Sequence, residues 1–205
     1  MPRKLEYDWG KRFMSWLRKR WAVLANPHAT VRFEEPVYAG PGFKLYLGNG
    51  ATFIVGPGSE FRSNFYAEIL GHGEIRIGAR AVLSHGSLIQ CTTSIVLGDD
   101  CNLGQCTGIF DGAHRFRDPS TSMLDQGYDY RPIRIEDGAT VMTKVTITNS
   151  IGERAVIGAH AVVTRPIPPY TLAVGAPAKP VEYFGPPGRE PPELRGDSGE
   201  LVPAP

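Results

Sequence analysis

Aliphatic residues recur every six positions through the middle of the chain. Residues 151–162 read IGERAV followed by IGAHAV, and the same register appears as IGARAV from Ile77 and as LGDDCN and LGQCTG from Leu97 onward. A period of six fits neither an amphipathic helix nor a single strand, whose periods are about 3.6 and about 2 residues. The repeat therefore predicts a solenoid, in which short parallel strands stack coil upon coil around a continuous core.

The aliphatic residue of each hexapeptide is expected to point into this core. The small residue beside it lets the backbone turn the corner, and no single coil can bury its own apolar face. The predicted inward positions are Ile77, Leu83, Ile89, Leu97, Leu103, Ile109, Ile135, Val141, Ile147, Ile157 and Val163.

The repeats lie in one region of the chain, with different composition on either side. Residues 30–184 are expected to form one β-helical domain, which 205 residues and a hydrophobic content of 41% can support. Within it, residues 110–132 interrupt the period with Gly, Pro, Asp and Ser, and should protrude as a loop. The proline-rich tail 185–205 has little to bury and is expected to be disordered.

The N-terminal segment, residues 1–29, mixes aromatic and basic side chains. Its stretch WGKRFMSWLRKRWAVL is typical of a short basic amphipathic helix. One interpretation, which we favour, is that this helix covers the open end of the solenoid core. The other is a weak contact with a membrane surface through residues 9–24. Tryptophan suits both a packed end and a lipid interface, so both interpretations stay open.

Charge and cysteine content exclude some classes of partner. With 22 basic and 21 acidic residues the net charge is +1, so nucleic acid is not an expected partner. The three cysteines lack the spacing of a metal site and are expected to be packed free thiols in a reducing compartment. The sequence shows neither an apolar leader nor a membrane-spanning run, which predicts a cytoplasmic location.

His114 lies in IFDGAHRFRDP, where the repeat stops. The ungapped run LGDDCNLGQCTGIFDGAH, the loop end YDYRPIRI and the run VVTRPIPPYTLAVGAPAKPV resemble hexapeptide-repeat O-acetyltransferases of the maltose, galactoside and nodulation-factor type. The resemblance covers about residues 70–183. It implies an all-β, left-handed parallel β-helix, a homotrimer with active sites between subunits, acetyl-CoA as donor and a sugar or sugar-containing acceptor. No metal is expected.

The resemblance matches the catalytic histidine of the family to His114. Acyl transfer from a thioester to an alcohol needs a base at neutral pH, and the pKa of histidine lies nearest that pH. Asp111, or a carboxylate elsewhere, could orient the imidazole. Relatives place an acceptor-contacting asparagine in the stretch that reads LSHGSL here, and this chain has none there. Ser84, His85 and Ser87 are therefore the candidates for acceptor contact, with Asp111.

For the donor, the resemblance places five residues along a CoA groove. Backbone groups of Thr143 and Ala159 can bind the pantetheine amides, and Arg165 and Lys179 are cations suited to the phosphates, with Thr164 beside them. In this chain the segment TNSIG is two residues shorter than in relatives, which predicts either weaker donor binding or a wider pocket that accepts a longer acyl group.

Three alternatives remain at this stage. The acceptor could be the amine of an amino sugar, the acyl group could be longer than acetyl, or the solenoid could be a scaffold without catalysis. A zinc site of the carbonic anhydrase type would need three histidines. His85 and His114 could contribute to such a site, but neither His72 nor His160 is obviously placed to complete it.

Overall fold

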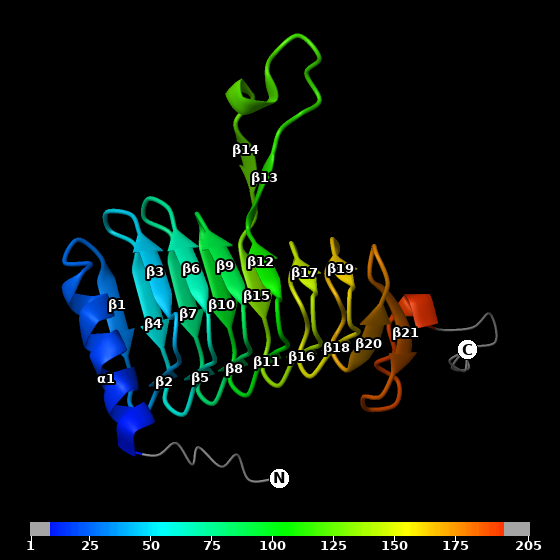
Figure 1. Ribbon diagram of the computed structural model, residues 1–205. Helices are drawn as coiled ribbons and strands as arrows, with labels where there is room; N and C mark the ends of the chain where they lie inside the picture. Colours follow the sequence, from blue (N-terminus) through cyan, green and yellow to red (C-terminus); the bar gives the residue numbers. More distant parts are fainter. Residues whose placement is uncertain (1–8, 195–205) are drawn as a thin grey trace.

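The computed structural model describes residues 9–194, and its fold is the predicted left-handed parallel β-helix (Figure 1). One helix, α1 (Trp9–Leu24), lies across the N-terminal end of the solenoid. Three sheets run along its length, and successive coils add strands to them in turn, although the last coils meet the first sheet only through isolated bridges at Ile151 and Ile167. The period of six thus corresponds to one face of a three-sided coil.

The strands of each sheet follow the order of the coils, and every pairing among the described residues of the three sheets is parallel except that of β20 with β21. The first sheet contains β1 (Thr30–Phe33), β4 (Thr52–Val55), β7 (Glu74–Ile77), β10 (Ser94–Leu97) and β15 (Ile133–Ile135). The second contains β2 (Tyr38–Ala39), β5 (Glu60–Phe61), β8 (Val82–Leu83), β11 (Asn102–Leu103), β16 (Thr140–Val141), β18 (Val156–Ile157), β20 (Thr171–Val174) and β21 (Lys179–Tyr183). The third contains β3 (Lys44–Leu47), β6 (Tyr66–Ile69), β9 (Leu88–Cys91), β12 (Gly108–Phe110), β17 (Thr146–Ile147) and β19 (Val162–Val163).

The core is a column of inward side chains, as the repeat predicted. Every predicted inward aliphatic residue is buried, and none is more than 3% exposed. The strand register places identical residues above one another: Ile75, Ile95 and Ile133 pair across β7, β10 and β15. Toward the N-terminal end the core becomes aromatic, with Phe61 and Phe65 in contact at a ring-centroid distance of 4.6 Å. The apolar face of each coil is therefore covered by its neighbours, which is what stabilises a solenoid.

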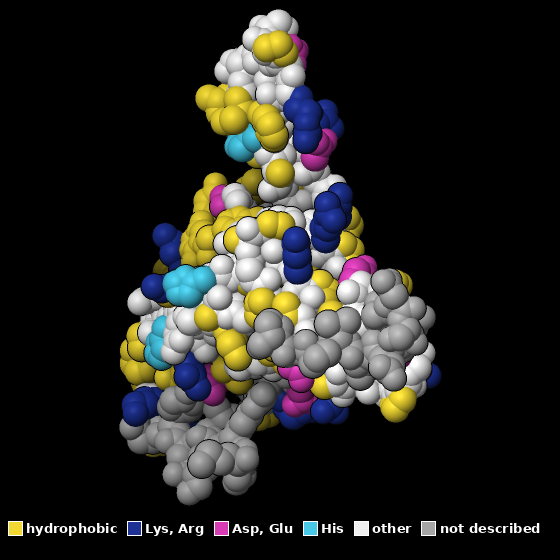
Figure 2. Space-filling model, turned by 90° about the vertical axis from the view of Figure 1, so that its right-hand side faces the viewer, with side chains coloured by type: hydrophobic (Ala, Val, Ile, Leu, Met, Phe, Trp, Pro, Cys, Tyr) yellow, Lys and Arg dark blue, Asp and Glu magenta, His cyan; other side chains and the backbone are white. Residues whose placement is uncertain are grey.

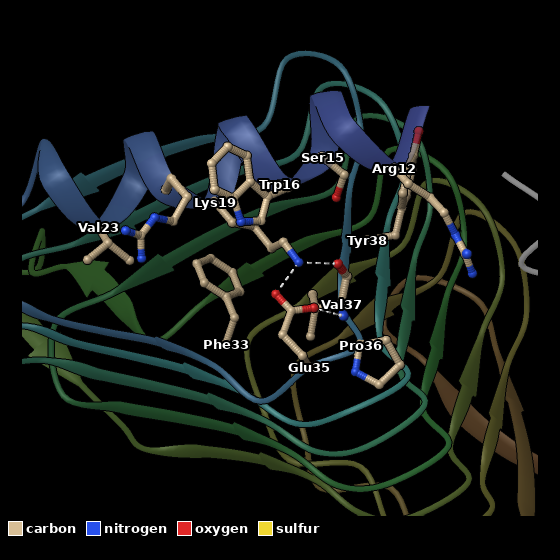
Figure 3. A pocket seen from close by; sticks show the side chains of 11 residues that line it. Arg12, Ser15, Trp16, Lys19, Val23, Phe33, Glu35, Pro36, Val37 and Tyr38 are labelled. Carbon is tan, nitrogen blue, oxygen red and sulfur yellow. Dashed lines mark hydrogen bonds and ion pairs between the residues drawn. The ribbon is translucent and has the colours of Figure 1, made fainter. Parts of the chain in front are cut away.

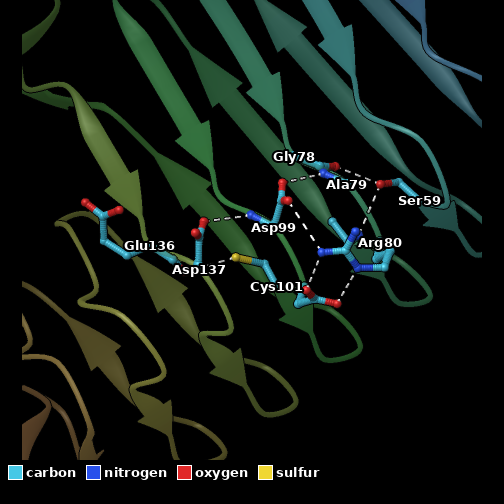
Figure 4. A network of polar contacts seen from close by, with 10 residues as sticks. Ser59, Gly78, Ala79, Arg80, Asp99, Cys101, Glu136 and Asp137 are labelled. Atoms are coloured by element: carbon cyan, nitrogen blue, oxygen red, sulfur yellow. Dashed lines mark hydrogen bonds and ion pairs between the residues drawn. The ribbon is translucent and has the colours of Figure 1, made fainter.

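The corner between the first and second sheets is held by side chains that bond from coil to coil (Figure 4). An oxygen of Asp99 accepts the Ala79 backbone N–H at 2.8 Å, and an oxygen of Asp137 accepts the Asp99 backbone N–H at 2.9 Å. Arg80 adds an ion pair to Asp100 on the next coil. These bonds satisfy backbone donors at turns where sheet hydrogen bonding stops, so each coil fixes the next.

Helix α1 confirms the predicted N-terminal helix, but its buried side is polar (Figure 3). Ser15 accepts the Ala39 backbone N–H at 2.8 Å, and the buried Lys19 ammonium donates to the Val37 carbonyl at 2.6 Å and pairs with Glu35. The helix is therefore fastened to the end coil by hydrogen bonds rather than by an apolar face. Within residues 9–194 no helix is long and apolar enough to cross a membrane.

Two segments lie outside the regular coils. Between β12 and β15 the chain leaves the solenoid as a hairpin of β13 (Gly112–His114) and β14 (Tyr128–Tyr130), with the 3-10 helix η1 (Met123–Asp125) at its far end. Of the tail expected to be disordered, residues 185–194 include the 3-10 helix η2 (Pro192–Leu194), whose Leu194 is buried. The remainder of that tail, 195–205, lies outside the described residues.

We predict that Ile95→Ala lowers the free energy of unfolding by about 2–5 kcal/mol, because it leaves a cavity in the column that the rigid neighbouring coils cannot close. Val96→Ala, the next residue on the same strand, is the matched control, since Val96 faces outward and is only partly buried. Its expected loss is about 1 kcal/mol or less. Urea unfolding followed by circular dichroism measures both, and equal losses would contradict the inward stack.

Candidate active site

The hairpin that carries His114 is anchored at its base by Asp111. This buried carboxylate accepts the backbone N–H groups of Thr92 and Thr93 at 2.9 Å and 2.6 Å and the Thr93 hydroxyl at 2.7 Å. The Arg131 backbone N–H closes the base by donating to the Asp111 carbonyl at 2.8 Å. Asp111 therefore joins the hairpin to the neighbouring coil, and its carboxylate is occupied there by donors other than His114.

The far part of the hairpin is ordered by local hydrogen bonds. Asp118 accepts the hydroxyls of Ser120 and Thr121 at 2.6 Å and 2.8 Å, and these bonds hold its pKa below the usual value. The Gln126 side-chain amide donates to the Asp118 and Thr121 carbonyls at 2.9 Å each. Arg115, which follows β13, also forms an exposed ion pair with Asp129 of β14. The arm is thus a structured element rather than a loose connection.

The ring of His114 lies against the ring of Tyr128. The two residues face each other across the antiparallel pair, and their ring centroids are 4.1 Å apart at an angle of 38°. Tyr130 stacks on Tyr128 in turn. The Nδ1 atom of His114 is buried and has no hydrogen-bond partner among residues 9–194. The other nitrogen, Nε2, is consequently the one left to meet a substrate.

A small groove of about 200 Å³ opens where the hairpin meets the solenoid. Asp111 and Thr164, two of the predicted site residues, both line it, together with Arg131 and Tyr130. Thr164 follows β19 at the same edge of the third sheet, and its carbonyl accepts a bond from Asn149 at 3.1 Å. Arg165 comes next and is exposed. This edge therefore combines the hairpin base with an exposed cation.

The opposite edge of the third sheet is a column of corners that holds the acceptor candidates Ser84, His85 and Ser87 and the donor candidates Thr143 and Ala159. His85 is exposed there, and its Nδ1 lies 2.5 Å from the Ser63 hydroxyl. Ser84 and Ser87 are buried, and the Ser87 hydroxyl donates to the Ser84 carbonyl at 2.7 Å within the turn. Of the three residues in this turn, His85 is the one that presents its side chain to the surface.

Thr143 and Ala159 continue the same column of corners. The Thr143 carbonyl accepts the His160 backbone N–H at 3.0 Å, and its hydroxyl donates to Gln105 at 3.0 Å. The backbone N–H of Thr143 and both backbone groups of Ala159 have no partner within the described part of the chain. Unpaired backbone groups in a row along a surface corner can pair with the amides of an extended ligand.

Parallel pairing keeps these two edges apart within one chain. His85 precedes β9, whereas His114 follows β12, and the two strands lie side by side in the same direction. Lys179 lies near the Ala159 corner, because it pairs with Val174 at the end of β20 and the neighbouring Ala178 N–H donates to the Val162 carbonyl at 2.8 Å. One edge therefore holds His114, Asp111, Thr164 and Arg165, while the other holds Ser84, His85, Ser87, Thr143 and Ala159.

Two of the cysteines, Cys91 and Cys101, are buried, and Cys106 is exposed. Burial raises the pKa of Cys91 to about 12, with a further contribution from the negative charge of Asp111, and burial likewise raises the pKa of Cys101 to about 12. Thiols with so little thiolate at neutral pH are packing groups rather than nucleophiles. Cys106, predicted to be packed like the others, is exposed on the corner between those of His85 and Thr143.

Two residues of the site were not assigned a role from the sequence. Tyr128 supports the imidazole, and its signal in the sequence is the aromatic pair of YDYRPIRI. Gln105 bonds Thr143, and nothing in the hexapeptide LGQCTG distinguishes it from other turn residues. A cross-strand contact depends on the hairpin register, which the loop sequence does not specify.

Comparison with known proteins gives relatives in sequence and in fold. A probable acetyltransferase of Mycobacterium tuberculosis is 32% identical over 168 residues, which are 78% of this chain and 53% of that protein. The chain thus spans about half the length of this relative. No model of a known protein family matches the chain.

Two solved structures share the architecture. A hexapeptide-repeat acetyltransferase of Vibrio cholerae, in complex with acetyl-CoA, superposes with a TM-score of 0.60 at 21% identity and covers 86% of this chain and 88% of its own. A variant of an N-acyltransferase of Bacillus cereus, in complex with dTDP and coenzyme A, superposes with a TM-score of 0.65 at 13% identity and covers 80% and 88%.

The fold and the site together define a hexapeptide-repeat protein with a histidine-bearing arm. In sequence the chain is similar to the probable acetyltransferase over 78% of its length, and in architecture to the two solved acyltransferases. Membership of the maltose, galactoside and nodulation-factor type is a finer assignment and stays a prediction.

We predict that Asp111→Ala loosens the hairpin, because it leaves the backbone donors of Thr92 and Thr93 without their acceptor. The expected loss is about 2–4 kcal/mol in the free energy of unfolding, with trypsin cleavage in the arm at least about tenfold faster. Asp129→Ala removes the exposed pair with Arg115 and should cost about 1 kcal/mol or less. Cleavage at equal rates in the two variants would refute the anchoring role.

Proposed function

We propose that the chain is an acetyl-CoA-dependent O-acetyltransferase that acetylates a hydroxyl of a sugar or sugar-containing metabolite, with His114 as general base. The observation that carries the proposal is the setting of His114, which projects from the solenoid on an anchored arm with its ring supported by Tyr128. A base must be held firmly but remain open to substrate, and this arrangement supplies both conditions. Figure 2 shows hydrophobic, basic, acidic and histidine side chains on the projecting arm.

The reaction needs one proton to be moved twice. The Nε2 atom of His114 takes the proton of the acceptor hydroxyl as the oxygen attacks the thioester carbonyl. A backbone N–H or a small polar side chain stabilises the oxyanion of the tetrahedral intermediate. The C–S bond then breaks, the acetyl group stays on the acceptor oxygen, and the imidazolium returns the proton to the departing thiolate. Base catalysis of this kind accelerates reactions by about a hundredfold to ten-thousandfold.

The donor is assigned to the corner of Thr143 and Ala159 and to the cations near the C-terminal coils. The unpaired backbone groups at this corner suit the two amides of pantetheine. Arg165 and Lys179 are both exposed and suit the nucleotide phosphates, with Thr164 beside the first of them. The residues present therefore fit a CoA thioester as a substrate.

A homotrimer brings the two edges together in this proposal. Within one chain the arm of His114 and the corner of Thr143 lie at opposite edges of the third sheet, so a complete site requires the arm of one subunit beside the corner of another. The exposed apolar side chains of Phe116, Met123 and Leu124 on the arm support a subunit contact there.

We predict that His114→Ala abolishes transfer while leaving donor binding intact. Thiol release from acetyl-CoA, screened over mono- and disaccharides and amino sugars, should fall about a hundredfold to ten-thousandfold with the acceptor that the wild type uses. Calorimetric titration of acetyl-CoA should give the same Kd for both proteins.

His72→Ala is the matched control, because His72 is an exposed turn histidine and should keep full activity. If His114→Ala retained wild-type turnover, the base assignment would fall. If neither protein bound acetyl-CoA, the scaffold alternative would replace the enzyme. Product linkage separates the hydroxyl acceptor from an amine, and titration with longer acyl-CoA esters tests the wider pocket.

The cationic part of the donor site is tested by Arg165→Gln combined with Lys179→Gln. Loss of two charge-assisted phosphate contacts should weaken acetyl-CoA binding at least about tenfold, and the effect should shrink as salt is added. Arg154→Gln with Arg189→Gln removes the same charge from other exposed sites and should leave the Kd unchanged. Equal weakening in both double variants would show only a general effect of net charge.

A further inference from the structure

Helix α1 turns its polar side to the protein and its apolar side to solvent, the reverse of an ordinary surface helix. The side chains that it buries against the end coil are Ser15, Lys19 and Ala22, which are small or charged. An amphipathic helix of a globular protein normally turns its apolar face to the core. Here that face points away from the solenoid, so covering the core does not explain the aromatic residues of the helix.

The outward face is a continuous apolar row. Trp9, Phe13, Leu17 and Trp21 recur every four residues and therefore lie along one side of the helix. Their exposed fractions are 79%, 44%, 39% and 72%, and Leu24 extends the row with 70%. The rings of Trp9 and Phe13 stack at 5.5 Å, which makes the surface flat and continuous. An exposed row of this kind marks an interaction surface.

Cations flank this row, and no acidic residue lies within α1. Arg12, Trp16 and Arg20 form the adjoining row, and Arg20 lies over the Trp16 ring at 5.9 Å. The three line an open groove of about 670 Å³ whose other wall includes Phe33 and Glu35, the latter paired with Lys19 (Figure 3). On the far side of the helix, Arg18 and Lys44 line a second groove of about 520 Å³. The apolar row thus has positive charge on both sides.

We propose that the outer face of α1 binds a membrane surface that carries anionic headgroups. Aromatic side chains at a lipid interface insert their apolar rings, and flanking Arg and Lys side chains reach the headgroup phosphates. Charge favours this occupant over a second copy of the chain. A contact between two α1 helices would bring Arg12 and Arg20 against the same cations, with no acidic residue in the helix to balance them.

The position of α1 is compatible with activity on the bound protein. The helix lies across the N-terminal end of the solenoid, whereas the hairpin with His114 projects from its side (Figure 1). Binding through α1 therefore leaves the arm and the corners of the third sheet free. The proposal concerns this surface alone and does not depend on the reaction proposed above.

Tryptophan fluorescence offers a direct test, because all three tryptophans of the chain lie in α1. The full chain is mixed with phosphatidylcholine vesicles that contain phosphatidylglycerol, and with vesicles of phosphatidylcholine alone. We expect a blue shift of the emission and co-sedimentation with the anionic vesicles, weakened by salt. Brominated acyl chains should quench the emission, since the rings would enter the interface.

Paired variants separate the apolar row from the charges. Trp9→Ser with Trp21→Ser should weaken partitioning at least about tenfold, while Phe184→Ser, an exposed aromatic at the other end of the solenoid, should not. Arg12→Gln with Arg20→Gln should remove the preference for anionic vesicles, and Arg154→Gln with Arg189→Gln should retain it. All of these side chains are exposed, so folding should survive, which circular dichroism checks.

Several results would overturn the proposal. Unshifted emission with anionic vesicles would exclude a membrane surface, as would equal partitioning of the α1 variants and their controls. Light scattering without lipid gives another decisive result. If wild type formed assemblies that Trp9→Ser with Trp21→Ser dissolved, the row would be a contact between copies of the chain.

Discussion

The structure depends on the stacking of coils through parallel hydrogen bonds in register with an inward aliphatic column. Strands about 4.8 Å apart place Ile75, Ile95 and Ile133 directly above one another, so each coil covers the apolar face of the next. The corner bonds of Asp99 and Asp137 add backbone satisfaction where the strands end. Since every coil needs its neighbours, the stack of coils is rigid.

The chain leaves the stacked coils at the β13–β14 hairpin, which carries the candidate catalytic residue His114. Asp111 joins the arm to the adjacent coil, and Tyr128 supports the ring of His114, so the histidine projects without being loose. A side chain inside a coil has neither the reach nor the solvent access for proton transfer. The stacked coils therefore give the hairpin a rigid base, and the anchored hairpin holds the proposed base His114 above the groove where the two meet.

The ends of a solenoid pose a separate problem, because the last coil has no neighbour on one side. At the C-terminal end, β21 and the buried Leu194 of η2 fold back onto the structure. At the N-terminal end, α1 is attached through Ser15 and Lys19 and leaves its tryptophans outward. The C-terminal end is thus closed by packing, while the N-terminal end carries the exposed apolar row of α1.

The sequence by itself determined the solenoid, its inward column and the break at His114, because a period of six requires one buried position per face in every coil. It also predicted α1, but not which side faces the core, since the hydrogen bonds of Lys19 to Val37 and Glu35 exist only once distant segments meet. Only the tertiary structure placed Thr143 and His114 at opposite edges and set Tyr128 against the imidazole. Those relations follow from strand direction and hairpin register, which are properties of paired segments rather than of any one of them.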